Sequence, residues 1–513
     1  MATGDDLRCP VVETAEDGHG RPGGRWWMAV ALLVLLAAGL AVRLHHLDDS
    51  VLAFHPTRQL HSAIIARDLY LEQTADVDDP GRVAADRARR AQGGLEAPVN
   101  EYVVAGLYLV NGRESTWLAG VWASILWLVG GAFLVAAVGR FVGRLGQLVT
   151  LAVHLFTPLA VAAGRSFQPD PLMVTAVVGA AWASLRWVER RSWGRLVAAG
   201  AMAGLAVLVK PFALPLVLGA FAAVAAHDRG VRRTAADPQA WAFAALAVGP
   251  WVLALASGSA ARSDPGDYFV ASLLASGAFY RAWGRQITDN IGLVVLAVGL
   301  VGGLLVARGR ARALLLGLVG GYLAACGAFD FRVAGHSYYH LVLVPILALG
   351  CGIAVDAVPG WLARRELSVA RLLVAPVLVL ALLALVASAW GNVPTVPDGN
   401  DLPGDVQAAA ALVEPGGRVL GMTDAYGREL AYYGDLVVVG EIPGPGDRQL
   451  AELQGEPVPD LATEIDRTGA EWVVVTSLEK EVLDPDTIAE LRDHYVLVGS
   501  SPTWSVYDVR TRR

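Results

Sequence analysis

The polar residues best suited to chemistry early in the chain lie in one short segment, FHPTRQLHSAIIARDLY, which covers Phe54–Tyr70. The spacing of Ala63, Ala66 and Tyr70 predicts a helix with one apolar face, so the polar side chains point elsewhere. Guanidinium groups bind phosphate oxygens, and imidazoles exchange protons near neutral pH. The segment predicts either an amphipathic surface helix or one wall of an active site, and its candidate site residues are His55, Arg58, Gln59 and His61.

Acidic groups follow in two later places. Glu96 and Glu101 precede an apolar segment, and a solvated loop is the simplest interpretation of either one alone. Asp170 begins an apolar run, where its carboxylate suits a helix N-terminus, although it could equally serve as a base or a metal ligand. Arg165, shortly before it, suits a phosphate because guanidinium binds phosphate oxygens in a bidentate fork.

Two more sets complete the candidates. Lys210 is one of only two lysines in the chain and lies between two apolar segments. It could extend to the membrane surface, or it could pair with a lipid phosphate. Further on, His336, Tyr338 and Tyr339 lie together. Interfacial tyrosines are common membrane anchors, but the neighbouring histidines also suit the binding of a sugar or a diphosphate.

The composition predicts a membrane protein. Of 513 residues, 55% are hydrophobic and 17% are charged, and the mean hydropathy is +0.47. Soluble domains carry about 25% charged residues. The net charge of −7 gives no reason to expect a nucleic-acid partner. The three cysteines, Cys9, Cys326 and Cys351, lack metal-ligand spacing and predict no disulfide framework.

Apolar runs long enough to span a membrane recur along the chain and predict about eleven transmembrane helices. The run after residue 25 has no small-residue cleavage site, so we expect an uncleaved first helix, with a removed signal peptide as the alternative. The runs at 196–209 and 212–226 could be one helix broken at Lys210–Pro211. The runs lie near residues 26–45, 116–138, 146–163, 171–187, 239–256, 290–306, 312–328, 340–357, 371–390, and 196–209 with 212–226.

Loop charge predicts the orientation. Every second loop is rich in arginine, for example around Arg140, Arg190 and Arg232, whereas the alternate loops carry few basic residues. The positive-inside rule puts the arginine-rich loops in the cytoplasm. We therefore expect a multi-pass protein of the plasma (inner) membrane with a cytoplasmic N-terminus and an extracytoplasmic C-terminal domain. All five candidate sets then fall on the outer side.

Composition also divides the chain into domains. We expect a disordered cytoplasmic tail at 1–25, a transmembrane domain at 26–390 with a large outer loop at 46–115, and an outer α/β domain at 391–513. In the last, RVLGMT, LVVVGEI, EWVVVTS and YVLVGSS predict buried strands. Their alternation with helices predicts a partly parallel sheet. The predicted helices there are 405–413, 458–468 and 485–494, and 79–90 is predicted as a polar surface helix of the outer loop.

Several function classes are disfavoured by missing motifs. The sequence has no Walker loop, no GxGxxG after a strand, no HExxH and no GxSxG. A nucleotide-driven pump and a cytoplasmic sugar-nucleotide enzyme are therefore disfavoured. A secondary transporter would more often show polar residues in mid-span and an internal repeat.

The order of these segments resembles the C-type membrane glycosyltransferases, and most closely the branch with protein O-mannosyltransferases and aminoarabinose transferases. The resemblance covers roughly 26–390 and, more loosely, the C-terminal domain. It implies a polytopic helical fold that moves a sugar from a polyprenyl-phosphate carrier to an acceptor on the outer face. The acceptor would be a cell-envelope glycan, a lipid or a protein.

Individual residues carry this resemblance. Ala63, Ala66 and Arg67 fit the frame of the family's first-loop helix, whereas Arg58-Gln59 stands where the family has an Asp-Glu pair and Ser62 where it has Tyr. This is a bacterial Arg-Gln variant of the motif. Neither Arg nor Gln can act as the base that the family's acid is thought to provide. Other segments that resemble family motifs are Glu96-Ala-Pro98 with Tyr102, Arg165 with Pro169-Asp170-Pro171, Lys210-Pro211 and His336-Ser-Tyr338-Tyr339.

The resemblance implies an inverting transfer with a division of roles. We expect Arg165, Lys210 and Arg58 to hold the donor phosphate. Asp170 is the first choice as base, followed by Glu96, His61 and His55. We expect these residues to bind the sugar or the acceptor: Gln59, His55, Glu101, His336, Tyr338 and Tyr339.

Partners and alternatives complete the expectations. The expected partners are a polyprenyl-phosphate sugar, the bilayer and the acceptor. No cofactor is assigned, and a divalent metal is left open. A non-catalytic lipid-binding or assembly relative and a transporter or flippase of lipid-linked sugar are the alternatives.

Overall fold

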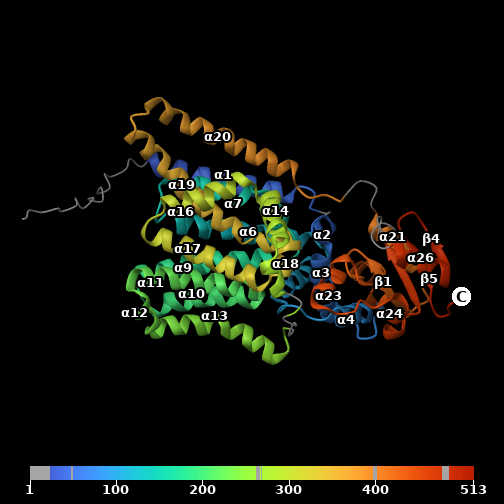
Figure 1. Cartoon of the computed structure of the whole chain (residues 1–513). Helices are drawn as coiled ribbons and strands as arrows, with labels where there is room; N and C mark the ends of the chain where they lie inside the picture. Colours follow the sequence, from blue (N-terminus) through green and yellow to red (C-terminus); the bar gives the residue numbers. More distant parts are fainter. Residues whose placement is uncertain (1–22, 48–49, 261–265, 267–268, 397–400, 477–484) are drawn as a thin grey trace, which may run out of the picture.

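Long apolar helices form most of the structure, and a smaller domain lies at one end of them (Figure 1). This computed structural model describes every residue except 1–22, 48–49, 261–265, 267–268, 397–400 and 477–484. The predicted disorder of residues 1–25 thus falls almost wholly outside the described residues. The first described helix begins at Gly23.

Within the described residues, eight helical segments are long and apolar enough to cross a membrane. A bent pair, broken at Gly292 by an angle of 102°, passes the same test as one unit, and two further apolar helices are shorter. Together they correspond one to one to the eleven predicted runs, although the number that crosses a membrane stays a prediction. The helices are α1 (Gly23–Leu44), α6 (Trp117–Val138), α7 (Arg144–Phe156), α9 (Asp170–Glu189), α10 (Trp193–Val209), α11 (Leu214–Arg229), α13 (Pro238–Ser257), α14 (Gly277–Ile291) with α15 (Leu293–Leu296), η4 (Ala297–Gly302) and α16 (Gly303–Val306), α17 (Gly309–Ala328), α19 (Leu343–Arg364) and α20 (Ser368–Gly391).

Short helices connect these spans. Most lie next to a proline or a glycine, which end regular helices. They are α2 (Ser50–Ala53), α8 (Pro158–Ala163), α12 (Val231–Ala235), η1 (Pro211–Ala213), η3 (Ala271–Ala275), α18 (Asp330–Gly335) and η5 (Ser337–His340).

The chain breaks between α10 and α11 at Lys210. Pro211 follows, and a residue before proline is pushed out of the helical region, so Lys210 adopts the extended angles φ −158° and ψ 114°. The Lys210 side chain thereby leaves both helices and turns into the protein, where it is 5% exposed. The local sequence thus explains why this lysine does not extend along a helix surface.

The outer loop contains three helices, α3 (Pro56–Thr74), α4 (Pro80–Gln92) and α5 (Val99–Asn111). Asp79 caps α4 by accepting a hydrogen bond from the backbone N–H of Arg82. Gly112 ends α5 with φ 77°, the left-handed region that glycine tolerates. The predicted helices at 58–70 and 79–90 are both present.

The C-terminal domain is a five-stranded sheet in the order β2-β1-β3-β5-β4. β1 pairs in parallel with β2 and β3, while β5 pairs antiparallel with β3 and β4, as the predicted mixed sheet requires. α20 ends at Gly391 and the domain's first helix begins at Leu402, so the predicted boundary falls between them. Its elements are α21 (Leu402–Ala410), β1 (Arg418–Thr423), α22 (Arg428–Tyr433), β2 (Val437–Glu441), α23 (Pro445–Gln454), α24 (Leu461–Thr468), β3 (Trp472–Thr476), α26 (Pro485–His494), β4 (Val496–Ser500) and β5 (Ser505–Asp508).

Two strand predictions in this domain are wrong in part, because both strands form edges of the sheet. LVVVGEI forms β2, whose residues are half-buried, and YVLVGSS forms β4, in which Val496–Val498 are exposed rather than buried. An apolar run reports β-propensity and not the strand's place in the sheet. Three elements were not predicted, β5, α22 and α23, because each is short and carries a weak pattern.

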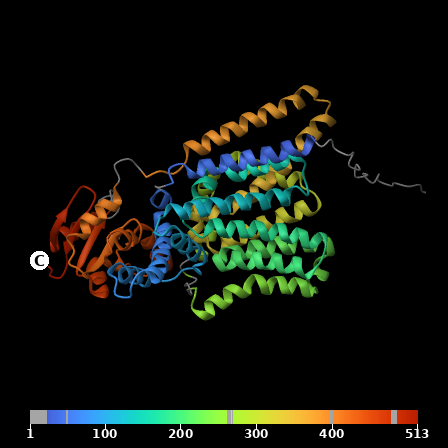
Figure 2. The ribbon, with the colours of Figure 1, turned by 180° about the vertical axis from the view of Figure 1, so that it is seen from behind.

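The C-terminal domain docks onto α3 (Figures 1 and 2). Arg67 donates from Nη1 to the carbonyl of Tyr432 at 2.6 Å and from Nε to the Glu114 carboxylate at 2.9 Å. Its guanidinium carbon lies 3.6 Å from the centre of the Tyr432 ring, whose hydroxyl donates to Glu114. Ala63 and Ala66 pack with Ala431 in one apolar cluster. The helix that carries the candidate site thus also holds the domain.

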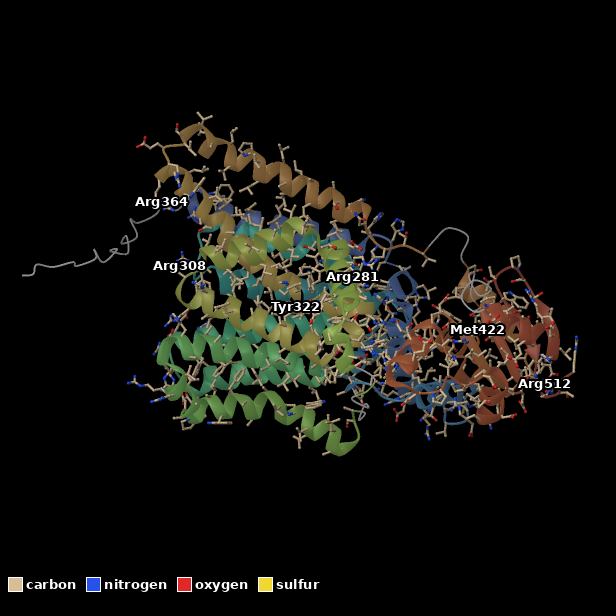
Figure 3. All side chains as sticks on the ribbon, viewed as in Figure 1. Arg281, Arg308, Tyr322, Arg364, Met422 and Arg512 are labelled. Carbon is tan, nitrogen blue, oxygen red and sulfur yellow. The ribbon has the colours of Figure 1, made fainter. Side chains whose placement is uncertain are left out.

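The arginine-rich loops lie at the other end of the helix bundle. Figure 3 shows Arg308 and Arg364 at the end far from Met422 and Arg512 of the C-terminal domain. This separation agrees with the charge alternation along the sequence. Which end faces the cytoplasm stays a prediction.

Arg67→Ala should loosen the docked domain. The substitution removes charge-assisted hydrogen bonds from a side chain that is only 20% exposed, and each is worth about 1.5–3 kcal/mol. We expect faster hydrogen exchange in α22 and a lower unfolding temperature. Arg467→Ala is the matched control because Arg467 is 63% exposed and pairs only within α24. Equal exchange in α22 for both variants would contradict this docking role.

Candidate functional site

A buried ion pair lies at the centre of the candidate site. Lys210 Nζ donates to Asp170 Oδ1 at 2.9 Å, and the two side chains are 5% and 0% exposed. Asp170 is the first residue of α9, so the helix N-terminus also favours its negative charge. Removal of one partner of such a pair leaves an uncompensated buried charge, which costs about 3–5 kcal/mol. The ion pair therefore joins the start of α9 to the break between α10 and α11.

Two aromatic rings complete the surroundings of the lysine. Nζ of Lys210 lies 4.7 Å from the centre of the Tyr338 ring and 4.3 Å from that of Tyr339. Both distances are within the range of a cation–π contact. The two tyrosines belong to η5 and stack with their ring centres 4.9 Å apart. The segment that begins at His336 thus lies against Lys210.

A second ion pair lies nearby on α3. Arg58 donates from Nη2 to both carboxylate oxygens of Glu96, at 3.0 and 2.8 Å. The side chains are 12% and 18% exposed. Asp170 and Tyr338 are among the groups that raise the pKa of Arg58 against the lowering effect of burial, so both ion pairs share one electrostatic site.

The first turn of α5 presents a second acid to α3. Ser62 Oγ donates to Glu101 Oε1 at 2.6 Å. Burial raises the pKa of Glu101, while the Ser62 hydrogen bond lowers it. Arg58 and Ser62, two of the three positions that depart from the family frame, therefore each contact a carboxylate from the segment Glu96–Glu101. The acids missing from α3 are placed beside it by its neighbour.

His55 enters the site in a strained conformation. It precedes Pro56 with φ 47°, in the left-handed region that few non-glycine residues adopt. Its Nε2 lies 3.0 Å from Ser337 Oγ, and its ring meets that of Tyr338 edge-on at 4.9 Å. The His336 ring centre is 6.0 Å away. Such strain is often concentrated at functional sites.

Both histidines are held neutral. Burial, His336 and Lys210 lower the pKa of His55 to about 4. Burial and the cations Arg332, Lys210 and Arg58 likewise lower the pKa of His336 to about 4. The site is thus electropositive enough to disfavour further positive charge, which is the property expected of an anion site.

Arg165 and Gln59 have partners other than the expected ones. Arg165 donates from Nη1 to the carbonyl of His45 at 2.5 Å and from Nη2 to that of His46, so it fastens the chain after α1. Gln59 donates to the carbonyl of Phe54 at 2.6 Å and accepts from the N–H of Phe167 at 2.8 Å. Both are nearly fully buried. These bonds make them positioning residues, and the phosphate and sugar contacts expected of them stay predictions.

His61 is buried on α3 behind Arg58. Its carbonyl accepts a hydrogen bond from Gln92, and its Nδ1 has no hydrogen-bond partner. Burial, followed by Arg58 and Arg428, lowers its pKa well below 6.5. His61 therefore lies between the candidate site and the C-terminal domain as a neutral imidazole.

Unpaired buried polar atoms gather around the ion pairs. Arg58 Nε, Asp170 Oδ2 and both amide atoms of Gln168 have no hydrogen-bond partner among the described residues. Unpaired buried polar groups are rare and costly, and they call for water or a ligand. Gln168 was not among the predicted site residues. Its place two residues before Asp170 is the signal that could have found it.

Within the described residues, no group of three or more His, Cys, Asp or Glu side chains is arranged to hold a metal ion. Asp170 is instead paired with Lys210. Involvement of a divalent metal stays a prediction.

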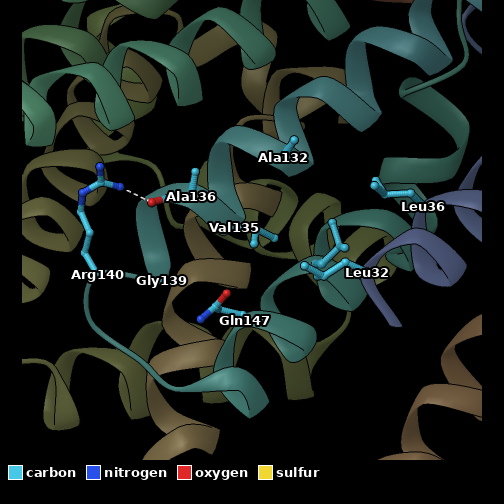
Figure 4. Close-up of a pocket in the computed structure, with 9 residues that line it drawn as sticks. Leu32, Leu36, Ala132, Val135, Ala136, Gly139, Arg140 and Gln147 are labelled. Atoms are coloured by element: carbon cyan, nitrogen blue, oxygen red, sulfur yellow. Dashed lines mark hydrogen bonds between the residues drawn. The ribbon is translucent and has the colours of Figure 1, made fainter. Parts of the chain in front are cut away.

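A large cavity lies away from this site, at the far end of α6 (Figure 4). It measures about 490 Å³ and lies between α1, α6 and α7, with walls that include Leu32, Val135 and Leu151. Arg140, at its rim, already pairs with Glu189 at 2.6 Å. Its apolar walls on membrane helices suit lipid chains and not a reaction.

The unpaired amide of Gln168 predicts an unusual stability effect. Gln168→Leu removes two unsatisfied buried polar atoms, each of which costs about 1–3 kcal/mol, so the ligand-free protein should be at least as stable as before. Gln59→Leu is the matched control, because it breaks two hydrogen bonds and should destabilise the protein. Unfolding temperatures of both variants in detergent test the difference. A Gln168→Leu variant that is as unstable as Gln59→Leu would contradict the assignment.

Known proteins share the fold that carries this site. A family model, dolichyl-phosphate-mannose-protein mannosyltransferase, matches residues 95–255. Apo ArnT from Cupriavidus metallidurans superposes with a TM-score of 0.58 at 15% identity, over 94% of this chain and 97% of that one. The same protein bound to undecaprenyl phosphate gives 0.54 at 14% identity, over 94% and 98%.

A third solved structure extends the likeness. The archaeal oligosaccharyltransferase AglB from Archaeoglobus fulgidus, in complex with an inhibitory peptide and a dolichol-phosphate, gives a TM-score of 0.56 at 12% identity, over 94% of this chain and 74% of that one. No curated protein sequence matches the chain. The chain therefore has the fold of the C-type membrane glycosyltransferase superfamily and resembles its protein O-mannosyltransferase and aminoarabinose transferase branch.

Proposed function

We propose that the protein transfers a sugar from a polyprenyl-phosphate donor to an acceptor at the outer face of the membrane. One observation carries this proposal: two buried cations, Lys210 and Arg58, lie in one electrostatic site, and each is paired with a carboxylate. The paired carboxylates stabilise the two buried cations before the donor binds, and the cations can then also bond to a phosphate.

The donor phosphate is held by Lys210 and Arg58. Lysine has three N–H donors, and the described hydrogen bond of Lys210 to Asp170 uses one of them. Arg58 keeps an unpaired buried Nε–H beside its bond to Glu96. These donors stabilise the charge that develops on the departing phosphate. The fold is shared with ArnT bound to undecaprenyl phosphate, which supports a lipid-linked phosphate as ligand.

Glu96 is the base in this proposal, and Asp170 positions Lys210. Asp170 is fully buried and bound to the lysine, whereas the Glu96 side chain is 18% exposed and can meet an incoming hydroxyl. The Glu96 carboxylate takes the acceptor's O–H proton while that oxygen bonds to the anomeric carbon. The bond from the anomeric carbon to the phosphate oxygen breaks, and polyprenyl phosphate leaves with the electron pair. The sugar is transferred with inversion.

Variants of Glu96, Lys210 and Asp170 should differ in their effects on transfer and on donor binding. Membranes that contain the full chain receive labelled polyprenyl-phosphate sugars, and free polyprenyl phosphate and labelled product are measured. Glu96→Gln should lower the transfer rate about 10²–10⁴-fold, because a general base is lost. Lys210→Ala and Asp170→Asn should weaken donor binding as well.

Asp228→Asn is the matched control. It breaks an ion pair with Arg310 in an arginine-rich loop at the other end of the bundle and should leave transfer unchanged. Full activity of Glu96→Gln at normal protein levels would contradict the base. Donor binding without release of polyprenyl phosphate in the unmodified chain would contradict transfer and favour a non-catalytic lipid-binding relative.

Phosphate binding should take up protons at mildly acidic pH. Burial, followed by nearby cations, holds the pKa values of His55 and His336 near 4, and the negative charge of a bound phosphate would raise them. The affinity for undecaprenyl phosphate should therefore rise as the pH falls from about 7 towards 5. Calorimetric titrations at pH 5.5 in two buffers of different ionisation heat measure the uptake. The double variant His55→Gln, His336→Gln should abolish it, and persistence of the uptake would contradict this assignment.

The same pKa values fix the stability of the ligand-free protein. Because each pKa lies below the ordinary value of 6.5, the unfolded chain binds more protons between pH 6.5 and 4. These histidines therefore lower stability as the pH falls through that window and contribute nothing above it.

A further inference from the structure

A second pocket lies where the C-terminal domain meets the outer loop, and we call it the interdomain pocket. Its volume is about 230 Å³. α3 and α4 form one wall, and β2, the turn that follows β1 and the start of α22 form the other. Ligands of open α/β sheets commonly bind at the carboxyl ends of parallel strands. Its lining residues are Ile64, Ala88, Ala91, Gln92, Tyr426, Gly427, Arg428, Ala431, Val438, Val439, Gly440 and Glu441.

The polar wall carries the carboxyl group of Glu441 and the guanidinium group of Arg428. Glu441 Oε1 accepts hydrogen bonds from the N–H of Thr423 at 2.7 Å and from its hydroxyl at 3.0 Å, while its buried Oε2 has no partner. Arg428 donates from Nε to Gln92 at 3.3 Å. Burial, followed by the charge of Glu429, raises the pKa of Glu441 well above its usual value, so the Glu441 carboxyl is neutral and can donate as well as accept.

The opposite wall is largely apolar. Ala88 and Ala91 of α4 and Ile64 of α3 face this pocket. An apolar wall with a few polar groups to fix orientation is typical of a small-molecule site. A sugar ring has this character, with a C–H face and hydroxyl edges that both donate and accept.

Charge argues against a cationic ligand. An ammonium group would be opposed by Arg428, and the neutral Glu441 carboxyl would offer it no compensating charge. A neutral, hydroxyl-rich group can bond to both Glu441 and Arg428. The pocket also adjoins the ion-pair site, because Gln92 bonds to the carbonyl of His61 and both Arg58 and Arg428 lower the pKa of that histidine.

We propose that the interdomain pocket binds a sugar ring of the acceptor, oriented by Glu441 and Arg428. The assignment of this ring to the acceptor rests on the proposed function. The outer loop and the C-terminal domain each supply one wall, so the pocket exists only when the domain is docked. The C-terminal domain thereby selects what is glycosylated.

Saturation-transfer NMR on the purified full-length protein in nanodiscs tests the pocket. The probes are free monosaccharides, namely a hexose, a pentose and an amino sugar. At least one neutral sugar should receive saturation. Ala91→Leu fills the pocket from an exposed position on α4 and should weaken that binding at least about tenfold. Ala84→Leu, on the same helix but outside the lining, is the matched control and should bind as before.

Other outcomes would overturn the proposal. Absence of saturation for every neutral sugar, a preference for the amino sugar, or equal binding by Ala91→Leu and the unmodified chain would each contradict it. Glu441→Gln supplies a second test, because it keeps the Thr423 bonds but should change which sugar binds best. The NMR measurements need no donor. If a sugar binds in them but the separate transfer assay shows no release of polyprenyl phosphate, the proposed transfer is contradicted and the pocket is not.

Discussion

The candidate site depends on the burial of two positive charges at the end of the bundle where the outer loop lies. Lys210 cannot stay charged there without Asp170, nor Arg58 without Glu96, because a buried charge costs several kcal/mol unless it is paired. These two pairs join four segments that are distant in sequence. The two ion pairs stabilise the ligand-free protein, and they also keep the N–H donors of Lys210 and Arg58 in place for an incoming anion. Unpaired atoms on Arg58, Asp170 and Gln168 at this place are consistent with a site completed by its ligand.

α3 connects this site with the C-terminal domain. One face presents Arg58 to Glu96, before α5, and Ser62 to Glu101, in its first turn. Another presents Arg67, which binds the backbone and the ring of Tyr432 in the C-terminal domain. A single helix thus positions both the proposed donor site and the interdomain pocket. Its departures from the family frame do not remove carboxylates from the site, because Glu96 brings one to the same helix face.

The sequence predicted the helical elements well, since apolar length and proline breaks report them directly. It placed Asp170 at a helix start and Lys210 at a break, and both positions are confirmed. It could not predict that these two residues pair, because 40 positions separate them and only the packing of α9 against α10 joins them. Arg165 illustrates a second limit, because residue type alone does not reveal the partners of a side chain. Its guanidinium suits phosphate, yet it donates to backbone carbonyls after α1. Gln168 escaped notice because an amide becomes informative only when its lack of partners is seen.

A structure of the full-length protein with bound polyprenyl phosphate would test the central claim most directly. We expect the phosphate oxygens at about 2.7–2.9 Å from Lys210 Nζ and Arg58 Nε, with Glu96 facing the open side of the site. The Lys210–Asp170 contact should persist or lengthen without separation of the two residues. A phosphate bound elsewhere, with both ion pairs intact and Arg58 Nε still unpaired, would contradict the account.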